Sequence, residues 1–288
     1  MAGQPHLLCS TGAFTRDPDR TDYRAILTYG PMLAVDGFEL LFYPDWYPDI
    51  EGIAVGLRAS GLRFPVLHAE KSIGPALGSD HPEVRALGLQ RLAENYRLGR
   101  LLGTTLLILH LWGLPGSDER LDRNLAALDA CLTMADGYGM GMAVETIPCV
   151  RADPLSNVRR ALDHDARCLV ALDTEFLAFH GQLDASLTAP WLWERASVAH
   201  MHVKDYDGRM VSADGRRRYL HPGEGHIDFV SVFGALSGHA FSGFVSLEAA
   251  AVDRTGTVDM SRIQASITAL RDLMPRYNNK KTLLARES

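Results

Sequence analysis

The chain has 288 residues, of which 47% are hydrophobic and 22% are charged. This composition is sufficient for a large apolar core and excludes global disorder. The formal net charge of −6 argues against a polyphosphate ligand, so we expect no nucleic-acid partner. No apolar run approaches the roughly 18–20 residues that a membrane span requires, so we expect no membrane partner either.

The first residues and the cysteines indicate a compartment. Residues 1–17 lack both the basic start and the long apolar stretch of a secretory signal. The four cysteines, Cys9, Cys131, Cys149 and Cys168, lie far apart and form no CxxC pair. We therefore expect reduced, mostly buried thiols in a cytoplasmic protein.

Short apolar runs alternate with longer helical patterns along the chain. The eight runs cover residues 7–11, 37–42, 64–69, 104–111, 141–147, 167–173, 198–205 and 242–249. Runs that are continuously apolar are typical of parallel strands buried on both faces. Helical patterns occupy residues 81–103, 119–139 and 258–274, among others.

Eight such units in about 270 residues predict an α/β protein with a single (β/α)8 TIM barrel over residues 1–275. A doubly wound sheet is the alternative, but no GxGxxG motif follows the first run and the chain has no Walker loop. Residues 276–288 are polar and basic, and we expect them to form a C-terminal tail.

Acidic residues and histidines occur near the ends of seven of the predicted strands. They are Glu39, His68 with Glu70, His110, Glu145, Asp173, His200 with His202, and Glu248. The C-terminal ends of barrel strands are where active sites are assembled. Charged groups there are costly unless they are paired, metal-bound or hydrated, so the pattern predicts a functional site.

Glu145, Asp173, His202 and Glu248 follow one another at intervals of about one βα unit, with a longer loop in the last interval. Three carboxylates and one imidazole that converge on the barrel axis need a cation. This donor set suits Mn²⁺, Mg²⁺ or Co²⁺, with Zn²⁺ as a further alternative. An open coordination position would make the ion a Lewis acid toward a carbonyl or hydroxyl oxygen. The competing interpretation is that each of the four is an ion-paired or capping residue.

At these residues the sequence resembles the xylose isomerase-like TIM-barrel family of sugar isomerases and epimerases, which is related to D-tagatose 3-epimerase and endonuclease IV. The resemblance covers nearly the whole chain. It is carried by AVETIP (143–148), LVALD (169–173), HMHVKDYDG (200–208), HPGEGHIDF (221–229) and FVSLEA (244–249). The HVKD segment followed by PGEGHID is the most specific of these motifs.

The resemblance implies that Glu145, Asp173, His202 and Glu248 hold one divalent ion, with Mn²⁺ as the expected species. It also implies that Glu145 and Glu248 are the acid/base pair, which moves a proton through an enediolate. Arg218 stands a few residues before the PG pair, where the family often places an arginine that binds substrate. Dimers and tetramers are common in the family, so a homodimer or a homotetramer is expected.

The sequence also departs from the family. Many relatives have a histidine three residues after the strand-six aspartate, where this chain has Phe176, and this leaves room for a less polar or bulkier substrate. His68 and His110 match endonuclease IV positions, but the chain lacks that enzyme's later Asp-x-His pair. We therefore expect both histidines to bond substrate hydroxyls, and Trp112 and Phe176 to form apolar pocket walls.

Two further features belong to the HVKD and PGEG motifs. Lys204 and Asp205 are expected to form an ion pair that orients the strand of His202. Gly223 and Gly225 are expected to let the backbone turn tightly close to a ligand.

The leading functional hypothesis is a metal-dependent isomerase or epimerase of a small carbohydrate-like molecule. It would act on a sugar, cyclitol or hydroxy-keto acid by removing a proton alpha to a carbonyl. The main alternative is a metal-dependent dehydratase or lyase acting on an oxo-sugar, inosose or dehydroshikimate-type substrate. Two further alternatives are a phosphodiester hydrolase like endonuclease IV and a barrel that binds a ligand without catalysis.

Overall fold

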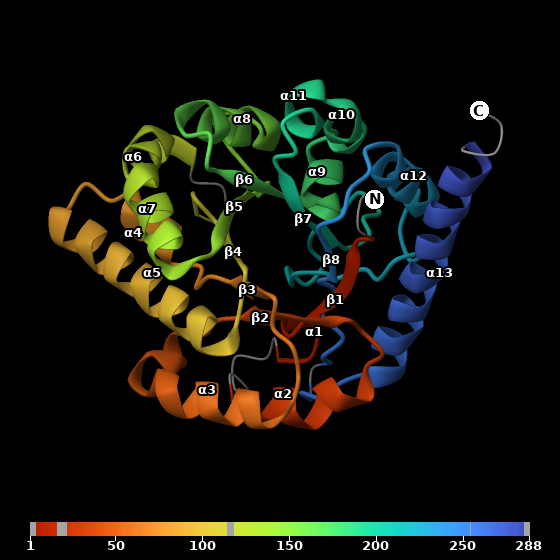
Figure 1. The fold of residues 1–288 in the computed structure, drawn as a ribbon, viewed down its shortest axis with the longest axis horizontal. Helices are drawn as coiled ribbons and strands as arrows, with labels where there is room; N and C mark the ends of the chain where they lie inside the picture. Colours follow the sequence, from red (N-terminus) through yellow and green to blue (C-terminus); the bar gives the residue numbers. More distant parts are fainter. Residues whose placement is uncertain (1–3, 16–21, 114–117, 254, 285–288) are drawn as a thin grey trace.

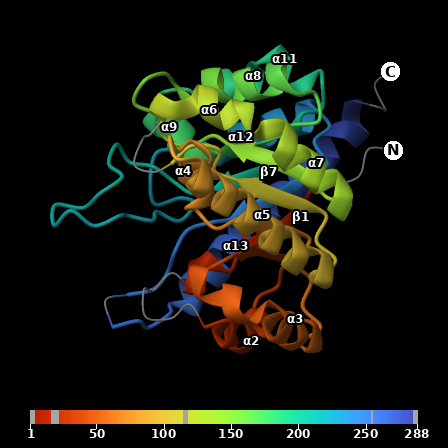
Figure 2. The ribbon, with the colours of Figure 1, turned by 90° about the vertical axis from the view of Figure 1, so that its left-hand side faces the viewer.

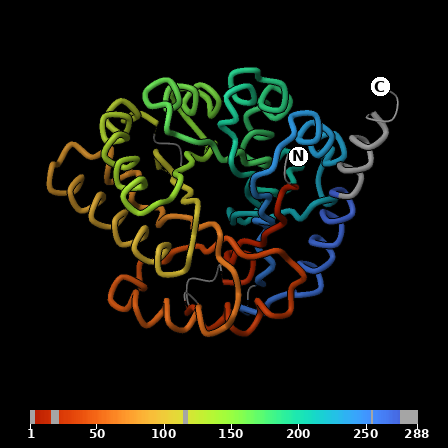
Figure 3. The backbone as a smooth tube through the Cα atoms, in the orientation of Figure 1, coloured from red at the N-terminus to blue at the C-terminus, as the bar shows by residue number. Residues whose placement is uncertain are grey.

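Eight parallel strands close into a barrel in chain order, β1 through β8, and helices surround it (Figure 1). The structure is a computed structural model that describes residues 4–15, 22–113, 118–253 and 255–284. The predicted (β/α)8 TIM barrel is confirmed. The backbone tube in Figure 3 passes once around the barrel from the N-terminal to the C-terminal elements, so neighbouring strands are also neighbours in sequence.

Each strand overlaps one predicted apolar run. The strands are β1 (His6–Ser10), β2 (Gly37–Leu41), β3 (Val66–His68), β4 (Leu106–Leu109), β5 (Gly141–Glu145), β6 (Leu169–Asp173), β7 (Val198–Val203) and β8 (Phe244–Leu247). The barrel closes where β1 pairs with β8, with His6 opposite Phe244.

The helices on the first half of the chain are α1 (Gly12–Thr15), α2 (Arg24–Tyr29), η1 (Gly30–Met32), η2 (Pro44–Asp49), α3 (Ile50–Ala59), α4 (Ile73–Leu77), α5 (Pro82–Leu102), η3 (Asp118–Arg120), α6 (Leu121–Ala126) and α7 (Leu128–Tyr138). Those on the second half are α8 (Pro154–His164), α9 (Thr174–Phe179), α10 (Leu183–Thr188), α11 (Pro190–Trp193), α12 (Phe229–Gly238) and α13 (Met260–Leu284).

Local sequence explains where the helices begin and end. The side chains of Asp153 and Asp228 accept hydrogen bonds from the first turns of α8 and α12. Gly103 and Gly139 adopt the left-handed conformation that ends α5 and α7. The pattern predicted as one helix over 119–139 is divided into α6 and α7 at Ala127.

Two details differ from the sequence prediction. The helix α13 continues through Leu284, so the predicted boundary between residues 275 and 276 falls inside a helix, and 285–288 lie outside the described residues. Apolar residues three and four apart in 81–103 predict one buried helix face. Of this face, Leu92 and Tyr96 are buried in α5, whereas Leu87 is 44% exposed. All four cysteines are buried and free, as expected.

The barrel interior changes from apolar to polar along the strands. Its apolar layer is made by Leu8, Val66, Leu106, Ile108, Ala143 and Ala171. Side chains two residues apart on a strand share a face, so His68 follows Val66 and Glu145 follows Ala143 into the same interior. The polar groups at the C-terminal end of the barrel therefore stand directly on this apolar layer.

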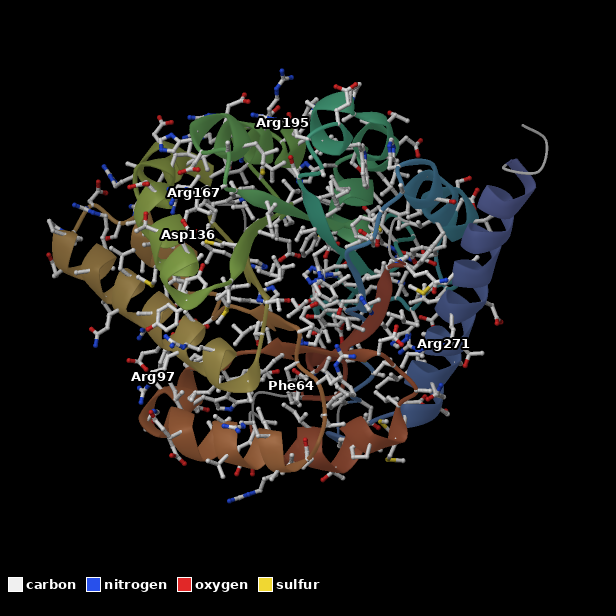
Figure 4. The ribbon with its side chains drawn as sticks, viewed as in Figure 1. Phe64, Arg97, Asp136, Arg167, Arg195 and Arg271 are labelled. Atoms are coloured by element: carbon white, nitrogen blue, oxygen red, sulfur yellow. The ribbon has the colours of Figure 1, made fainter. Side chains whose placement is uncertain are left out.

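Outside the barrel, charged side chains lie on the helical ring. Figure 4 shows Arg97, Arg195 and Arg271 at the periphery, and Arg167 beside Asp136, with 2.9 Å between Arg167 Nη1 and Asp136 Oδ2. Figure 2 shows the segment between β7 and α12 projecting beyond the barrel. Within the described residues, no helix is long and apolar enough to cross a membrane.

Candidate metal centre and active site

Four of the predicted site residues meet at the C-terminal end of the barrel. One donor atom from each of Glu145, Asp173, His202 and Glu248 can be chosen so that all lie within 4.8 Å of one another, and all four side chains are buried. We call this set the carboxylate cluster. Its members come from β5, β6, β7 and the residue after β8, so barrel closure brings together groups that are far apart in sequence.

Both ring nitrogens of His202 contact carboxylates. Its Nδ1 lies 2.8 Å from Glu145 Oε1, and its Nε2 lies 2.9 Å from both carboxylate oxygens of Glu39 on β2. Burial would lower the pKa of His202, but Glu39 and Glu145 raise it well above its usual value. A carboxylate on the far nitrogen fixes the ring orientation and tautomer of a metal-binding histidine.

Glu39 is one of the strand-end acids for which the sequence predicted no particular role. Glu39 also contacts a second histidine, since its Oε2 lies 3.0 Å from Nε2 of His200. The sequence could not show that His202 is the partner of Glu39, because the two residues are 163 positions apart and meet only across the closed barrel.

The second oxygen of Glu145 faces two histidines. Glu145 Oε2 lies 2.6 Å from His110 Nε2 and 3.2 Å from His68 Nε2. Burial would raise the pKa of Glu145, but the rings of His202 and His110 hold it well below its usual range. Burial lowers the pKa of His110 to about 4, although Glu145 opposes this shift. His68 and His110 thus surround a predicted catalytic carboxylate.

The two carboxylate oxygens of Asp173 have different partners. Its Oδ1 accepts a hydrogen bond from the Phe176 backbone at 3.0 Å and so caps α9. Its Oδ2 is fully buried, makes no hydrogen bond with favourable geometry, and lies 2.6 Å from Lys204 Nζ. Burial raises the pKa of Asp173 to about 7, while the Lys204 ammonium opposes the shift.

Lys204 reaches into the carboxylate cluster. Its Nζ also lies 2.6 Å from Glu248 Oε2 and 4.4 Å from the centre of the Phe176 ring. Burial would lower the pKa of Lys204, but Asp173 and Glu248 raise it. The predicted pairing of Lys204 with Asp205 is therefore wrong. Alternation from His202 would have placed Lys204 on the interior face.

Asp205 instead organises the following loop. Its two oxygens accept hydrogen bonds from the backbone N–H groups of Gly223, Gly225 and Ile227 at 2.8 to 3.0 Å. A Cβ atom at Gly225 would lie 2.4 Å from Asp205 Oδ1, and Gly223 has a φ of +93°. The two glycines thus allow a tight turn around Asp205, and a close approach of this turn to a ligand stays a prediction.

A cavity of about 160 Å³ opens onto the cluster. Its lining includes His110, Glu145, Phe176, Lys204, Arg217 and Glu248. A second cavity of about 310 Å³ shares Lys71 and Tyr219 with it. Larger cavities of about 350 and 470 Å³ lie at the opposite end of the barrel, and the residues lining them include Phe244 but no member of the cluster.

Two predicted pocket residues lie elsewhere. Arg218 pairs with Asp207 at 2.6 and 2.7 Å, and the arginine that lines the cavity is its neighbour Arg217, bonded to Glu175. Both arginines lie in the extended segment between β7 and α12, where successive side chains point to opposite sides. Sequence position alone therefore could not show which of the two lines the cavity. Trp112 is fully buried in the core and donates its Nε1–H to the Pro148 carbonyl at 3.2 Å.

The residues present fit a divalent ion. Carboxylate oxygens and one imidazole nitrogen are suitable donors for Mn²⁺ and similar ions. The buried carboxylates in and around the cluster outnumber the cationic groups Lys204, Arg217 and His202; they are Glu39, Glu145, Asp173, Glu175 and Glu248. Such an excess of buried negative charge favours an additional cation.

The fold and the carboxylate cluster define a TIM-barrel protein with a candidate metal centre. Residues 30–273 match the family model described as "Xylose isomerase-like TIM barrel". The chain belongs to this family, as its motifs predicted.

Solved structures with the same fold include several sugar epimerases. An L-ribulose 3-epimerase has a TM-score of 0.76 at 16% identity, over 97% of this chain and 98% of that one. A D-allulose 3-epimerase from Methylomonas sp. has a TM-score of 0.72 at 17% identity, over 94% and 97%. A 3-keto-D-glucoside 4-epimerase from E. coli has a TM-score of 0.69 at 16% identity, over 93% and 100%. Comparison with curated protein sequences found no match.

Proposed function

We propose that this protein is a divalent-metal-dependent isomerase or epimerase of a sugar or a related hydroxy-carbonyl compound. The observation that carries the proposal is the placement of Glu145 and Glu248 in one cavity, within the same four-residue cluster as Asp173 and His202. Family membership supports it, as do the sugar epimerases among the proteins of similar fold.

Glu145 and Glu248 are the proposed acid/base pair. They enter the cavity from β5 and from the end of β8, so a bound carbon between them can lose a proton to one and regain it from the other. His202 and His110 hold the pKa of Glu145 low, so this carboxylate is ionised at neutral pH. A low pKa also makes it a weak base, and a bound ion would offset this by acidifying the proton alpha to the carbonyl.

A divalent ion, with Mn²⁺ as the proposed species, would be held by the carboxylate cluster and would polarise the carbonyl oxygen of the substrate. Glu39 would hold His202 so that Nδ1 faces this position. Phe176 offers an apolar face to the C–H side of a sugar ring, and His110 is placed to bond a hydroxyl.

A metal-dependent dehydratase or lyase is the second candidate. The same proton removal would begin the reaction, and loss of a hydroxyl group would follow. The observation that favours this candidate is the Lys204 ammonium, which lines the cavity beside Glu248 and would donate a hydrogen bond to a departing hydroxyl oxygen. The two candidates differ in product: one returns an isomer and the other a dehydrated compound.

The test uses the full-length protein, treated with chelator and then supplied with Mn²⁺, in D₂O. Ketoses, inososes and hydroxy-keto acids are followed by NMR. Deuterium incorporated alpha to the carbonyl in an isomerised product supports the first candidate, and a dehydrated product supports the second. Chelator without added Mn²⁺ is expected to abolish either reaction.

Glu145→Gln and Glu248→Gln are each expected to reduce turnover by about 10²- to 10⁴-fold with the fold retained. Glu224→Gln is the matched control, because Glu224 pairs with Arg262 outside the cavity. Exchange that persists in both cavity variants would remove these glutamates from the chemistry. Absence of exchange with every substrate class would contradict the proposed function.

A further inference from the structure

We propose that the ammonium of Lys204 occupies a cation position within the carboxylate cluster and competes with a divalent ion for Asp173 and Glu248. Lys204 would then determine how readily the site takes up metal. The inference rests on the metal site of the proposed function, and it assigns a further residue to that site.

The geometry places the ammonium on two of the four candidate ligands. Lys204 Nζ lies 2.6 Å from Asp173 Oδ2 and 2.6 Å from Glu248 Oε2. Charge-assisted contacts of this kind usually measure about 2.7–2.9 Å, so both are close. Asp173 Oδ1 is already used to cap α9, which leaves Oδ2 as its oxygen for any cation.

A divalent ion bound to these oxygens would be strongly repelled by the ammonium. Ion–oxygen distances of about 2.0–2.2 Å, added to the 2.6 Å contacts, would place the two cations less than about 5 Å apart. Both would be buried, where charges interact more strongly than in water. Uptake of the ion is therefore expected to weaken or break the contacts of Lys204 with Asp173 and Glu248.

The surroundings offer the displaced ammonium another partner. Glu175 Oε2 lies 3.9 Å from Lys204 Nζ, and Glu175 is itself buried. The Phe176 ring lies beside the same nitrogen and can stabilise it by a cation–π interaction. A small movement of the lysine side chain could thus exchange one carboxylate partner for another without exposing the charge to solvent.

The test compares Mn²⁺ affinities of the chelator-treated full chain by calorimetry and by electron paramagnetic resonance of free Mn²⁺. Lys204→Met removes the charge and keeps a side chain of similar length. Lys71→Met makes the same change at an exposed lysine that lines the same cavity. We expect Lys204→Met to bind Mn²⁺ at least tenfold more tightly than the wild type, and Lys71→Met to change affinity less than threefold.

Unbalanced carboxylates could prevent Lys204→Met from folding without metal, so two measurements accompany it. Lys204→Gln keeps a polar group at the position, and its melting temperature is recorded with and without Mn²⁺. We expect Mn²⁺ to raise that temperature more in the variant than in the wild type. In crystals of the wild type soaked with Mn²⁺, anomalous scattering should locate the ion, with Lys204 Nζ no longer in contact with both Asp173 and Glu248.

The outcomes separate this inference from the proposed function. Tighter Mn²⁺ binding by Lys204→Met than by the wild type supports the inference. If only the variant binds Mn²⁺, the inference is again supported, but the wild-type reaction cannot depend on this metal. Equal or weaker binding in the variant, or an ion bound with both lysine contacts intact, overturns the inference and leaves the proposed function standing. Absence of Mn²⁺ binding in both proteins overturns both.

Discussion

Replacement of Glu39 by glutamine isolates the effect of one buried charge on the candidate metal centre. Both carboxylate oxygens of Glu39 lie 2.9 Å from His202 Nε2, on the side of the ring away from the cluster. Glutamine has the same length and can still accept one hydrogen bond, but it carries no charge. The His202 ring would keep its position while becoming a poorer electron donor at Nδ1.

The expected size of the effect follows from these contacts. Loss of such an outer partner typically costs about 10- to 100-fold in metal affinity, which corresponds to about 1.4–2.8 kcal/mol. The free energy of unfolding should also fall, by about 1.5–3 kcal/mol, because the charged contact of Glu39 with buried His202 is lost. Glu145 still faces the other ring nitrogen, and the desolvation cost of the Glu39 carboxylate is removed, so the loss stays below that of a fully unpaired buried charge. The variant should therefore lose affinity for metal without losing its fold.

The assay is calorimetric titration of the chelator-treated protein with Mn²⁺, accompanied by urea unfolding without metal. Glu70→Gln is the matched control, since Glu70 is also buried near a strand end but bonds Ser72, at 2.7 and 2.6 Å, outside the cluster. It should change affinity less than threefold. If the folded Glu39→Gln variant binds Mn²⁺ within twofold of the wild type, the orienting role of Glu39 is refuted.

Two further predictions concern carboxylates that bond backbone N–H groups. Asp205→Ala should lower the free energy of unfolding by about 2–4 kcal/mol in urea titrations, because the loop around Gly225 loses its acceptors; a loss under about 1 kcal/mol would contradict this. Although burial opposes it, the backbone N–H groups of Val150, Arg151 and Ala152 lower the pKa of Asp118. The resulting stabilisation is complete above the unfolded pKa of about 3.9 and disappears as pH falls through the folded value. Asp118→Asn should therefore be less stable than the wild type at pH 7, with a smaller difference at pH 3, and a constant or widening difference would refute the assignment.

The sequence by itself determined the barrel and the location of its site. Parallel strands that are buried on both faces consist of continuous apolar runs. The eight apolar runs in the sequence predicted the eight observed strands in their order. Because parallel strands all end at the same face, polar residues at their ends had to meet there. This is why Glu145, Asp173, His202 and Glu248 could be grouped without any structure.

Only the tertiary structure decided which polar groups contact one another. Strand order does not specify which side chains are close enough to touch across the barrel interior. The contact of Glu39 with His202 and that of Lys204 with Asp173 were therefore not predicted. In the segment between β7 and α12 successive residues face opposite sides, and only the structure shows that Arg217, not Arg218, lines the cavity. The partners of a buried charge depend on distances of a few ångströms, which are set by packing of the whole barrel.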